Sequence, residues 1–147
     1  MSQLELRRSE QRKKRLPWRL LPIGIVILTV LTALVHFILG LGTFWVASHG
    51  PAPVGSTPQG LVTIATLFLL NCIGYLALLV AFYLPWLKQV RPSIRWLLIG
   101  YTTLTIVVWY FVEFRHADMF DYSDKLIEVL LIALLLLDGS RARRLPA

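Results

Sequence analysis

The sequence predicts an all-α integral membrane protein with four transmembrane helices in an antiparallel bundle. The 147-residue chain is 56% hydrophobic and only 16% charged, whereas roughly a quarter of a soluble domain is charged. No Asp, Glu, Lys or Arg occurs between Leu20 and Leu87. A helix needs about 20 mostly apolar residues to cross a bilayer, and the basic residues flank such runs. These features favour several membrane spans.

A basic cytoplasmic tail, residues 1–17, precedes the first expected helix. The transmembrane domain covers residues 18–140, and its first span runs from about 20 to 46. This run is longer than the apolar region of about 7–15 residues found in a secretory signal. We therefore expect it to be a membrane span that is retained.

The three remaining spans follow at about 61–84, 94–112 and 122–138. A turn rich in Gly and Pro precedes the second span, and Pro85 ends it. Trp96 and Trp109 lie near the two ends of the third span, as belt aromatics do. The fourth has about 17 residues, or roughly 25 Å at the helical rise, and is short for a hydrocarbon core of about 30 Å.

The distribution of basic residues predicts the orientation of the helices. The N-terminal tail with Arg19 holds seven basic residues, the loop before the third span three, and the C-terminal segment 141–147 three more. The opposite side holds only Arg115 and Lys125. Since Lys and Arg accumulate on the cytoplasmic side, we expect a multi-pass protein of the cell membrane with both ends in the cytoplasm. This alternation also supports the short fourth span.

Small and weakly polar residues predict which helix faces pack, because such residues tend to mark helix contacts in membranes. In the first span they recur at spacings of four and three: Thr29, Ala33, His36, Gly40, Thr43 and Ala47. The second span offers Asn71, Gly74, Leu78 and Ala81, and the third offers Gly100, Thr103 and Val107. We expect the Asn71 amide to form a hydrogen bond across helices, since leaving it unsatisfied in hydrocarbon is costly.

The candidate intramembrane polar site consists of His36, Asn71, Lys125 and Glu128. Ionisable groups at membrane depth suggest function, because a charge there costs at least about 2.5–3.5 kcal/mol. Glu128 lies roughly 9 Å, and His36 roughly 15 Å, inside the outer boundary. Two interpretations remain open: a Lys125–Glu128 pair at spacing i,i+3 near the interface, and a His36–Glu128 contact that handles protons.

The sequence lacks the motifs of an enzyme, a haem protein, a disulfide-linked protein or a nucleic-acid-binding protein. No catalytic residue, metal site or cofactor is predicted. A haem held by two histidines needs two at matching depth, and only His36 is deep, since His49 and His116 belong to the outer edge. Cys72 is the only cysteine, which excludes a disulfide framework within one chain. The net charge is +7. The basic residues responsible for it flank the apolar runs, and this position predicts contact with membranes rather than with nucleic acid.

Three stretches resemble small four-helix integral membrane proteins of prokaryotes that have no assigned function. They are NCIGYLALLVAFYLP (71–85), IRWLLIGYTTLTIVVW (94–109) and DKLIEVLLIALLLL (124–137). The resemblance covers the last three spans and implies a helical membrane fold, without a substrate or activity. Small multidrug exporters have a similar size and helix count, but the resemblance to them is poor. They have a membrane carboxylate in their first helix, where this chain has His36. DoxX-like proteins are a further loose comparison.

The leading functional hypothesis is a non-enzymatic accessory, assembly or scaffolding subunit. A small proton-coupled transporter that uses Glu128 and His36 is the alternative, and a membrane redox or haem subunit is a third. The expected partners are a bilayer with anionic headgroups and either a second copy of the chain or a larger membrane complex. Basic residues of the N-terminal region would contact the headgroups: Arg12, Lys13, Lys14, Arg15 and Arg19.

Overall fold

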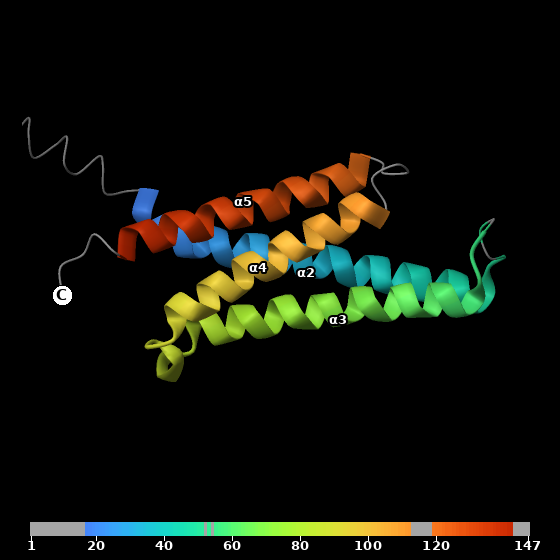
Figure 1. The fold of residues 1–147 in the computed structure, drawn as a ribbon, viewed down its shortest axis with the longest axis horizontal. Helices are drawn as coiled ribbons and strands as arrows, with labels where there is room; N and C mark the ends of the chain where they lie inside the picture. The colour runs from blue at the N-terminus through green and yellow to red at the C-terminus, as the bar shows by residue number, and fades with distance from the viewer. Residues whose placement is uncertain (1–16, 52, 54, 113–118, 143–147) are drawn as a thin grey trace, which may run out of the picture.

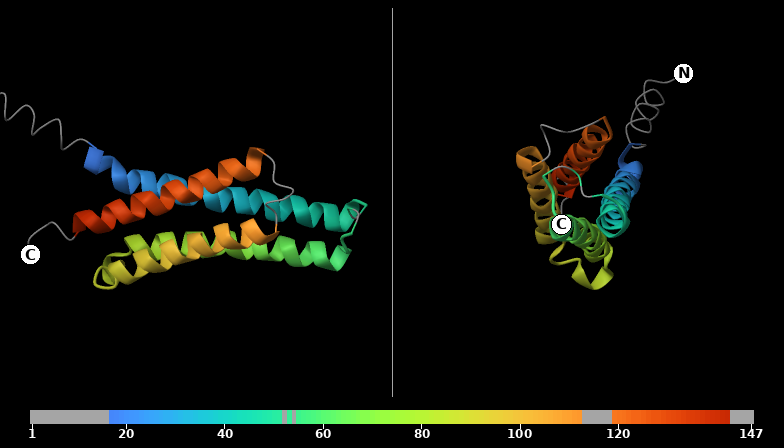
Figure 2. Two further views of the ribbon diagram at one scale, coloured as in Figure 1. Left: turned by 45° about the horizontal axis from the view of Figure 1, so that its top comes forward. Right: turned by 90° about the vertical axis from the view of Figure 1, so that its right-hand side faces the viewer.

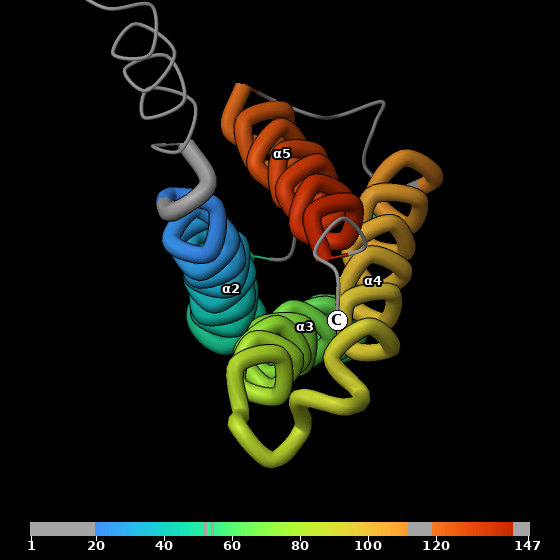
Figure 3. Tube along the Cα trace, turned by 90° about the vertical axis from the view of Figure 1, so that its left-hand side faces the viewer, coloured from blue at the N-terminus to red at the C-terminus, as the bar shows by residue number. Residues whose placement is uncertain are grey.

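Four long helices form the protein in a computed structural model that describes residues 17–51, 53, 55–112 and 119–142. They are α2 (Pro17–His49), α3 (Pro58–Tyr83), α4 (Arg91–Val112) and α5 (Met119–Ala142), and a short 3-10 helix, η1 (Pro85–Leu87), follows α3 (Figure 1). Each helix packs against the next in the chain, and α5 packs back against α2. The end-on view in Figure 3 shows the resulting ring, which confirms the predicted all-α bundle.

Local sequence signals set the limits of α3. The Thr57 side chain accepts a hydrogen bond from the Gly60 backbone N–H (3.1 Å), and Pro58 occupies the first turn. Thr at the N-cap and Pro at the first helical position both favour a helix start. The helix ends at Tyr83, and Leu84 has extended backbone angles before Pro85, as expected for a residue that precedes proline.

Three of the helices are long and apolar enough to cross a membrane: Leu20–His49 within α2, Pro58–Tyr83, and Arg91–Phe111 within α4. The fourth predicted span corresponds to α5, which is 24 residues long but carries charged residues toward both of its ends. In Figures 1 and 2, α5 runs alongside the other helices. The observed helices exceed most of the predicted limits, and α4 begins three residues before the predicted third span.

The ring encloses a core to which all four helices contribute. Its fully buried apolar side chains include Ile25 of α2, Leu98 of α4, and Leu131 and Leu135 of α5. The opposite faces carry exposed Leu, Ile, Val and Phe side chains, as in a bundle whose outer surface meets lipid. Two of the buried threonines bond within their own helix: Thr29 donates to the Ile25 carbonyl (2.7 Å) and Thr102 to the Leu98 carbonyl (2.8 Å).

The predicted packing face of the first span is correct. Thr29, Ala33, His36 and Gly40 are buried, and Thr43 and Ala47 are half-buried. At Gly40 the backbones approach closely, since an added Cβ would lie 2.9 Å from the Leu69 side chain of α3. Small residues therefore mark the α2–α3 contact as expected.

The predicted packing face of α4 is wrong, and that of α3 lies beside the true one. Gly100, Thr103 and Val107 are exposed, whereas Leu98 and Thr102 are buried. The residues on which this prediction depended therefore lie on the outer face of α4. On α3 the residues Asn71, Gly74, Leu78 and Ala81 are half-buried, while the deepest face includes Ala65, Cys72, Tyr75, Leu79 and Phe82.

Candidate functional site

A fully buried carboxylate, Glu128 of α5, lies at the centre of a polar cluster inside the bundle. The Tyr75 hydroxyl of α3 donates to Glu128 Oε1 (3.1 Å), and the Thr105 hydroxyl of α4 lies 3.0 Å from the same oxygen. Tyr75 and Thr105 are also within hydrogen-bond distance of each other (3.0 Å). Three helices thus meet at one carboxylate oxygen.

The ammonium group of Lys125 bridges two carboxylates. Its Nζ lies 2.8 Å from Asp124 Oδ2 and 2.8 Å from Glu128 Oε2. The Lys125 side chain is 12% exposed, and those of Asp124 and Glu128 are 5% and 0% exposed. The Trp109 ring of α4 lies beside this ammonium, which is 5.9 Å from the ring centroid. The cluster therefore contains its own cation.

His36 brings α2 into the cluster. Its Nδ1 lies 2.8 Å from the Thr32 backbone carbonyl, and because a carbonyl can only accept, Nδ1 carries the hydrogen. The other ring nitrogen, Nε2, lies 4.0 Å from Glu128 Oε1. Phe68 and Tyr75 flank the ring, each with its centroid 5.8 Å away. The imidazole is held in one orientation with Nε2 toward Glu128.

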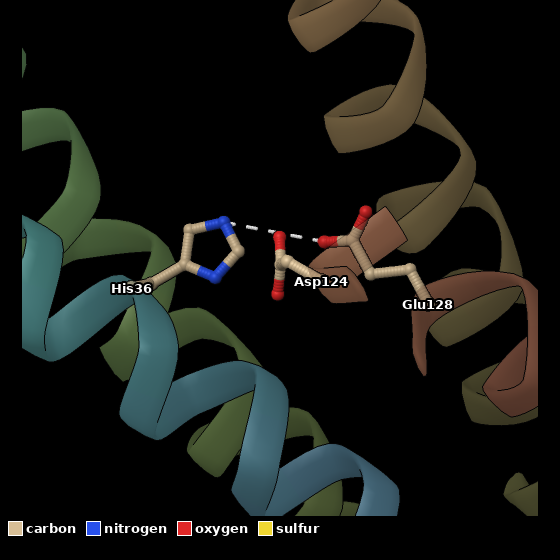
Figure 4. Close-up of side chains that lie close together, drawn as sticks. All are labelled: His36, Asp124 and Glu128. Atoms are coloured by element: carbon tan, nitrogen blue, oxygen red, sulfur yellow. Dashed lines mark ion pairs between the residues drawn. The ribbon is translucent and has the colours of Figure 1, made fainter. Parts of the chain in front are cut away.

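Three side chains of this cluster could together hold a metal ion. One ligand atom each from His36, Asp124 and Glu128 lies within 4.8 Å of the others, and all three residues are buried. Figure 4 shows the Asp124 carboxylate projecting between the imidazole and the Glu128 carboxylate. Asp124 Oδ1 is buried and has no hydrogen-bond partner in the described part of the chain.

The structure contains both of the Glu128 contacts that the sequence suggested. The Lys125–Glu128 pair is present, and His36 also approaches Glu128. The pair lies inside the bundle, where Glu128 has no exposed surface. Asn71 is half-buried, and its backbone carbonyl, rather than its side-chain amide, accepts a hydrogen bond from the Tyr101 hydroxyl (3.4 Å).

Sequence reasoning missed three members of the cluster: Tyr75, Thr105 and Asp124. Tyr75 and Thr105 look like ordinary residues of apolar helices. Asp124 had a usable signal, since it precedes Glu128 by four residues and residues at that spacing share a helix face. The prediction considered only the pairing of Glu128 with Lys125, three residues before it, and with His36. In the structure Asp124 and Glu128 are buried, and Lys125 reaches them from the edge.

The remaining histidines do not join this cluster within the described residues. His49 is at the end of α2, where it is exposed and stacks on Trp45 with 4.2 Å between ring centroids. His116 is outside the described residues, as are four of the predicted lipid contacts: Arg12, Lys13, Lys14 and Arg15. Arg19 belongs to α2.

A second polar contact joins α4 to α5 near the other end of the bundle. Arg95 Nη2 lies 3.4 Å from Asp138 Oδ2, and both side chains are largely buried. Gly139 makes room for the guanidinium, because a Cβ there would lie 2.6 Å from Arg95 Nη1. Arg91 lies over the Phe82 ring, 4.4 Å from its centroid. The predicted basic loop is thus partly the first turns of α4.

Comparisons of the chain with protein-family models, curated proteins and solved structures found no match.

Proposed function

We propose that the protein is a small, non-enzymatic, multi-pass membrane transporter that binds a cation at the His36–Asp124–Glu128 cluster and carries it across the bilayer. In this proposal α5 is the fourth span, and both chain ends are cytoplasmic. The packing of α5 against α2 and α4 supports a fourth crossing, because α5 then shares the depth of its neighbours. Anionic headgroups are the proposed partners of the basic segments at the cytoplasmic side.

The main support for this proposal is the position of the Lys125 ammonium. Two buried carboxylates and one ammonium leave a formal negative charge while the imidazole is neutral, and charges of this kind are costly at membrane depth. The ammonium neutralises one carboxylate charge by touching both groups at 2.8 Å. It occupies the place where an incoming cation would gain most from the two carboxylates.

Lys125 can then act as a tethered substitute for the transported cation. When the cation binds, the flexible lysine side chain turns toward the outer end of α5, as long basic side chains do near interfaces. When the cation leaves, the ammonium returns and keeps the two carboxylates balanced. The empty protein could therefore change conformation without two uncompensated buried charges, which would otherwise be costly.

Flux measurements in vesicles test the proposed transport. Purified protein is reconstituted, and entry of Na⁺, K⁺, Mn²⁺ and Zn²⁺ is followed with trapped indicator dyes. We expect entry of at least one of these cations above the protein-free rate, and loss of that entry in Glu128→Gln. The double variant Arg95→Leu/Asp138→Leu is the control, because it removes a carboxylate from the same helix outside the cluster together with its partner on α4. Equal rates in wild type and Glu128→Gln would reject transport through the cluster.

A specific observation supports an accessory or assembly subunit as the second candidate. Gly100, Thr103 and Val107 form an exposed strip on α4, with no atom within 4 Å of a Cβ added at Gly100. Small residues that face lipid allow a partner helix to approach closely. Mild-detergent purification followed by light scattering tests this candidate: a complex of the wild type that Gly100→Leu dissociates would support it, and a monomer would contradict it.

A further inference from the structure

We propose that His36, Asp124 and Glu128 bind a divalent transition-metal cation of the zinc type. This inference rests on the proposed function and names the cation that the cluster takes. Three helix positions supply the ligands, one from α2 and two from successive turns of α5. The site would therefore connect the first and last helices of the bundle through the metal.

The donor atoms select the class of cation. Zinc binds both His nitrogen and Asp or Glu oxygen, and zinc sites with three protein ligands keep a further position open for an exchangeable ligand. Mg²⁺ and Ca²⁺ prefer oxygen ligands throughout, so His36 argues against them. Imidazole suits zinc and its transition-metal neighbours.

The surrounding groups prepare these donors for a metal. The hydrogen bond from His36 Nδ1 to the Thr32 carbonyl leaves the Nε2 lone pair directed at Glu128. Metal-binding histidines commonly use their second nitrogen in this way. Tyr75 and Thr105 hold Glu128 Oε1 through their hydroxyls. Ligand orientation is thus fixed by α3 and α4 as well.

The spacing requires only a modest contraction. Two ligand atoms in a tetrahedral zinc site lie roughly 3.3 Å apart, given zinc–ligand distances near 2.0–2.1 Å. His36 Nε2 and Glu128 Oε1 are 4.0 Å apart, and all three ligand atoms lie within 4.8 Å. Asp124 Oδ1, which is buried without a hydrogen-bond partner among the described residues, would gain the metal as its partner.

Charge balance supports a divalent ion. The two carboxylates carry two negative charges, which a divalent cation neutralises once the Lys125 ammonium has moved away. Lys125 contacts the other oxygens of the two carboxylates, Asp124 Oδ2 and Glu128 Oε2, so it competes with the metal for their negative charge. Replacing it with the uncharged Met, which has a similar length, removes the competition and leaves all three ligands in place.

Cobalt spectroscopy on the full chain in detergent tests the site. Co²⁺ added to the purified protein should give the visible absorption of a tetrahedral complex at one ion per chain, and Zn²⁺ should displace it. His36→Gln, Asp124→Asn and Glu128→Gln should each weaken binding by at least about tenfold, since changes even to second-shell groups cost 10–100-fold. Lys125→Met should bind more tightly, and the double variant Arg95→Leu/Asp138→Leu, which removes a charge pair outside the cluster, should match the wild type.

One further variant separates loss of a ligand from loss of the fold. His36→Cys supplies a thiolate, which is also a zinc ligand. It should retain Co²⁺ binding and add a sulfur-to-cobalt charge-transfer band. That band would place the metal at position 36. Circular dichroism and gel filtration identify any variant that no longer folds.

The outcomes distinguish this inference from transport itself. No cobalt spectrum at millimolar Co²⁺, or binding unchanged in both Asp124→Asn and His36→Gln, overturns the metal site. If Glu128-dependent flux of Na⁺ or K⁺ persists in that case, the proposed transport stands with a different cation. If Co²⁺ binds as expected but vesicles show no flux, the metal site stands and transport is rejected.

Discussion

At the scale of single residues, the bundle pairs several of its buried charged groups with a partner of opposite charge. Lys125 touches Asp124 and Glu128, and Arg95 touches Asp138. Burying an ion costs several kcal/mol unless a close partner and hydrogen bonds compensate it. The charged residues of α5 are therefore tolerated inside the bundle because its neighbours complete each pair or network.

The sequence could identify only part of this arrangement. His36, Lys125 and Glu128 stand out because ionisable residues are conspicuous among apolar ones. Tyr75 and Thr105 do not, since their role depends on which helices become neighbours. A prediction from periodicity gives the faces of one helix, whereas a contact such as Tyr75–Glu128 depends on the rotation and depth of two helices together.

Removing Asp138 should destabilise the protein, because Arg95 would remain as a largely buried, unpaired charge. We expect Asp138→Ala to lower the free energy of unfolding by about 3 kcal/mol, the usual scale when one partner of a buried pair is lost. Denaturant titration of the detergent-solubilised protein, followed by circular dichroism, measures this change. The double variant Arg95→Leu/Asp138→Leu should recover most of it; equal losses in the single and double variants would show that the pair is unimportant.

At the scale of helices, the place where two backbones approach closely and the face of a helix that is buried are separate properties. The small residues of α2 predicted its buried face because α2 and α3 lie close together at Gly40. The same reasoning failed for α4, which buries Leu98 and Thr102 and leaves Gly100 exposed. The small residues of a helix show where its backbone could approach another helix. Whether it does so depends on how all four helices pack together.

Two glycines provide a matched test of this distinction. At Gly74 of α3 an added Cβ would overlap the Tyr101 hydroxyl, and Tyr101 packs edge-to-face on Tyr75 with 5.1 Å between centroids. Gly74→Ala should therefore lower the thermal stability, because the rigid Tyr101 ring must move. Gly100→Ala meets no atom within 4 Å and should be neutral or raise stability by up to about 1 kcal/mol through helix propensity.

Thermal melts of the two variants in the same detergent check this pair. A loss of stability in Gly100→Ala would indicate that α4 contacts another chain through its outer strip. Equal stability of Gly74→Ala and the wild type would contradict the close approach of α3 and α4.

At the scale of the whole molecule, three helices are long and apolar enough to span a membrane. A fourth crossing by α5 stays a prediction from charge, because the C-terminal arginines would otherwise lie on the side opposite to the other basic segments. The charged residues of α5 make it less apolar than the other three helices. Some of these residues pair within α5, as Lys125 does with Asp124 and Glu128, and Asp138 pairs with Arg95 of α4.

Reporter fusions test this topology. A reporter after Ala147 should be active in the cytoplasm, and one inserted in residues 48–60 should be active outside, because thirteen basic residues lie on one side and two on the other. A reporter inserted in residues 115–121 should also read external. An external reporter after Ala147 would remove the fourth crossing and, with it, the proposed depth of Glu128.

The unequal lengths of the helices have a consequence for the surrounding lipid. The apolar part of α2 has 30 residues and that of α4 has 21, or about 45 Å and about 31 Å of helix. The apolar helix α3 has 26 residues, or about 39 Å, so of the three only α4 matches a hydrocarbon core of about 30 Å. In a membrane, the side formed by α2 and α3 would have to tilt or thicken the bilayer, whereas the α4 side would fit it, so the hydrophobic mismatch would differ between the two flanks. Mismatch of this kind favours membranes of suitable thickness, and the protein should orient itself along any boundary between thick and thin lipid domains.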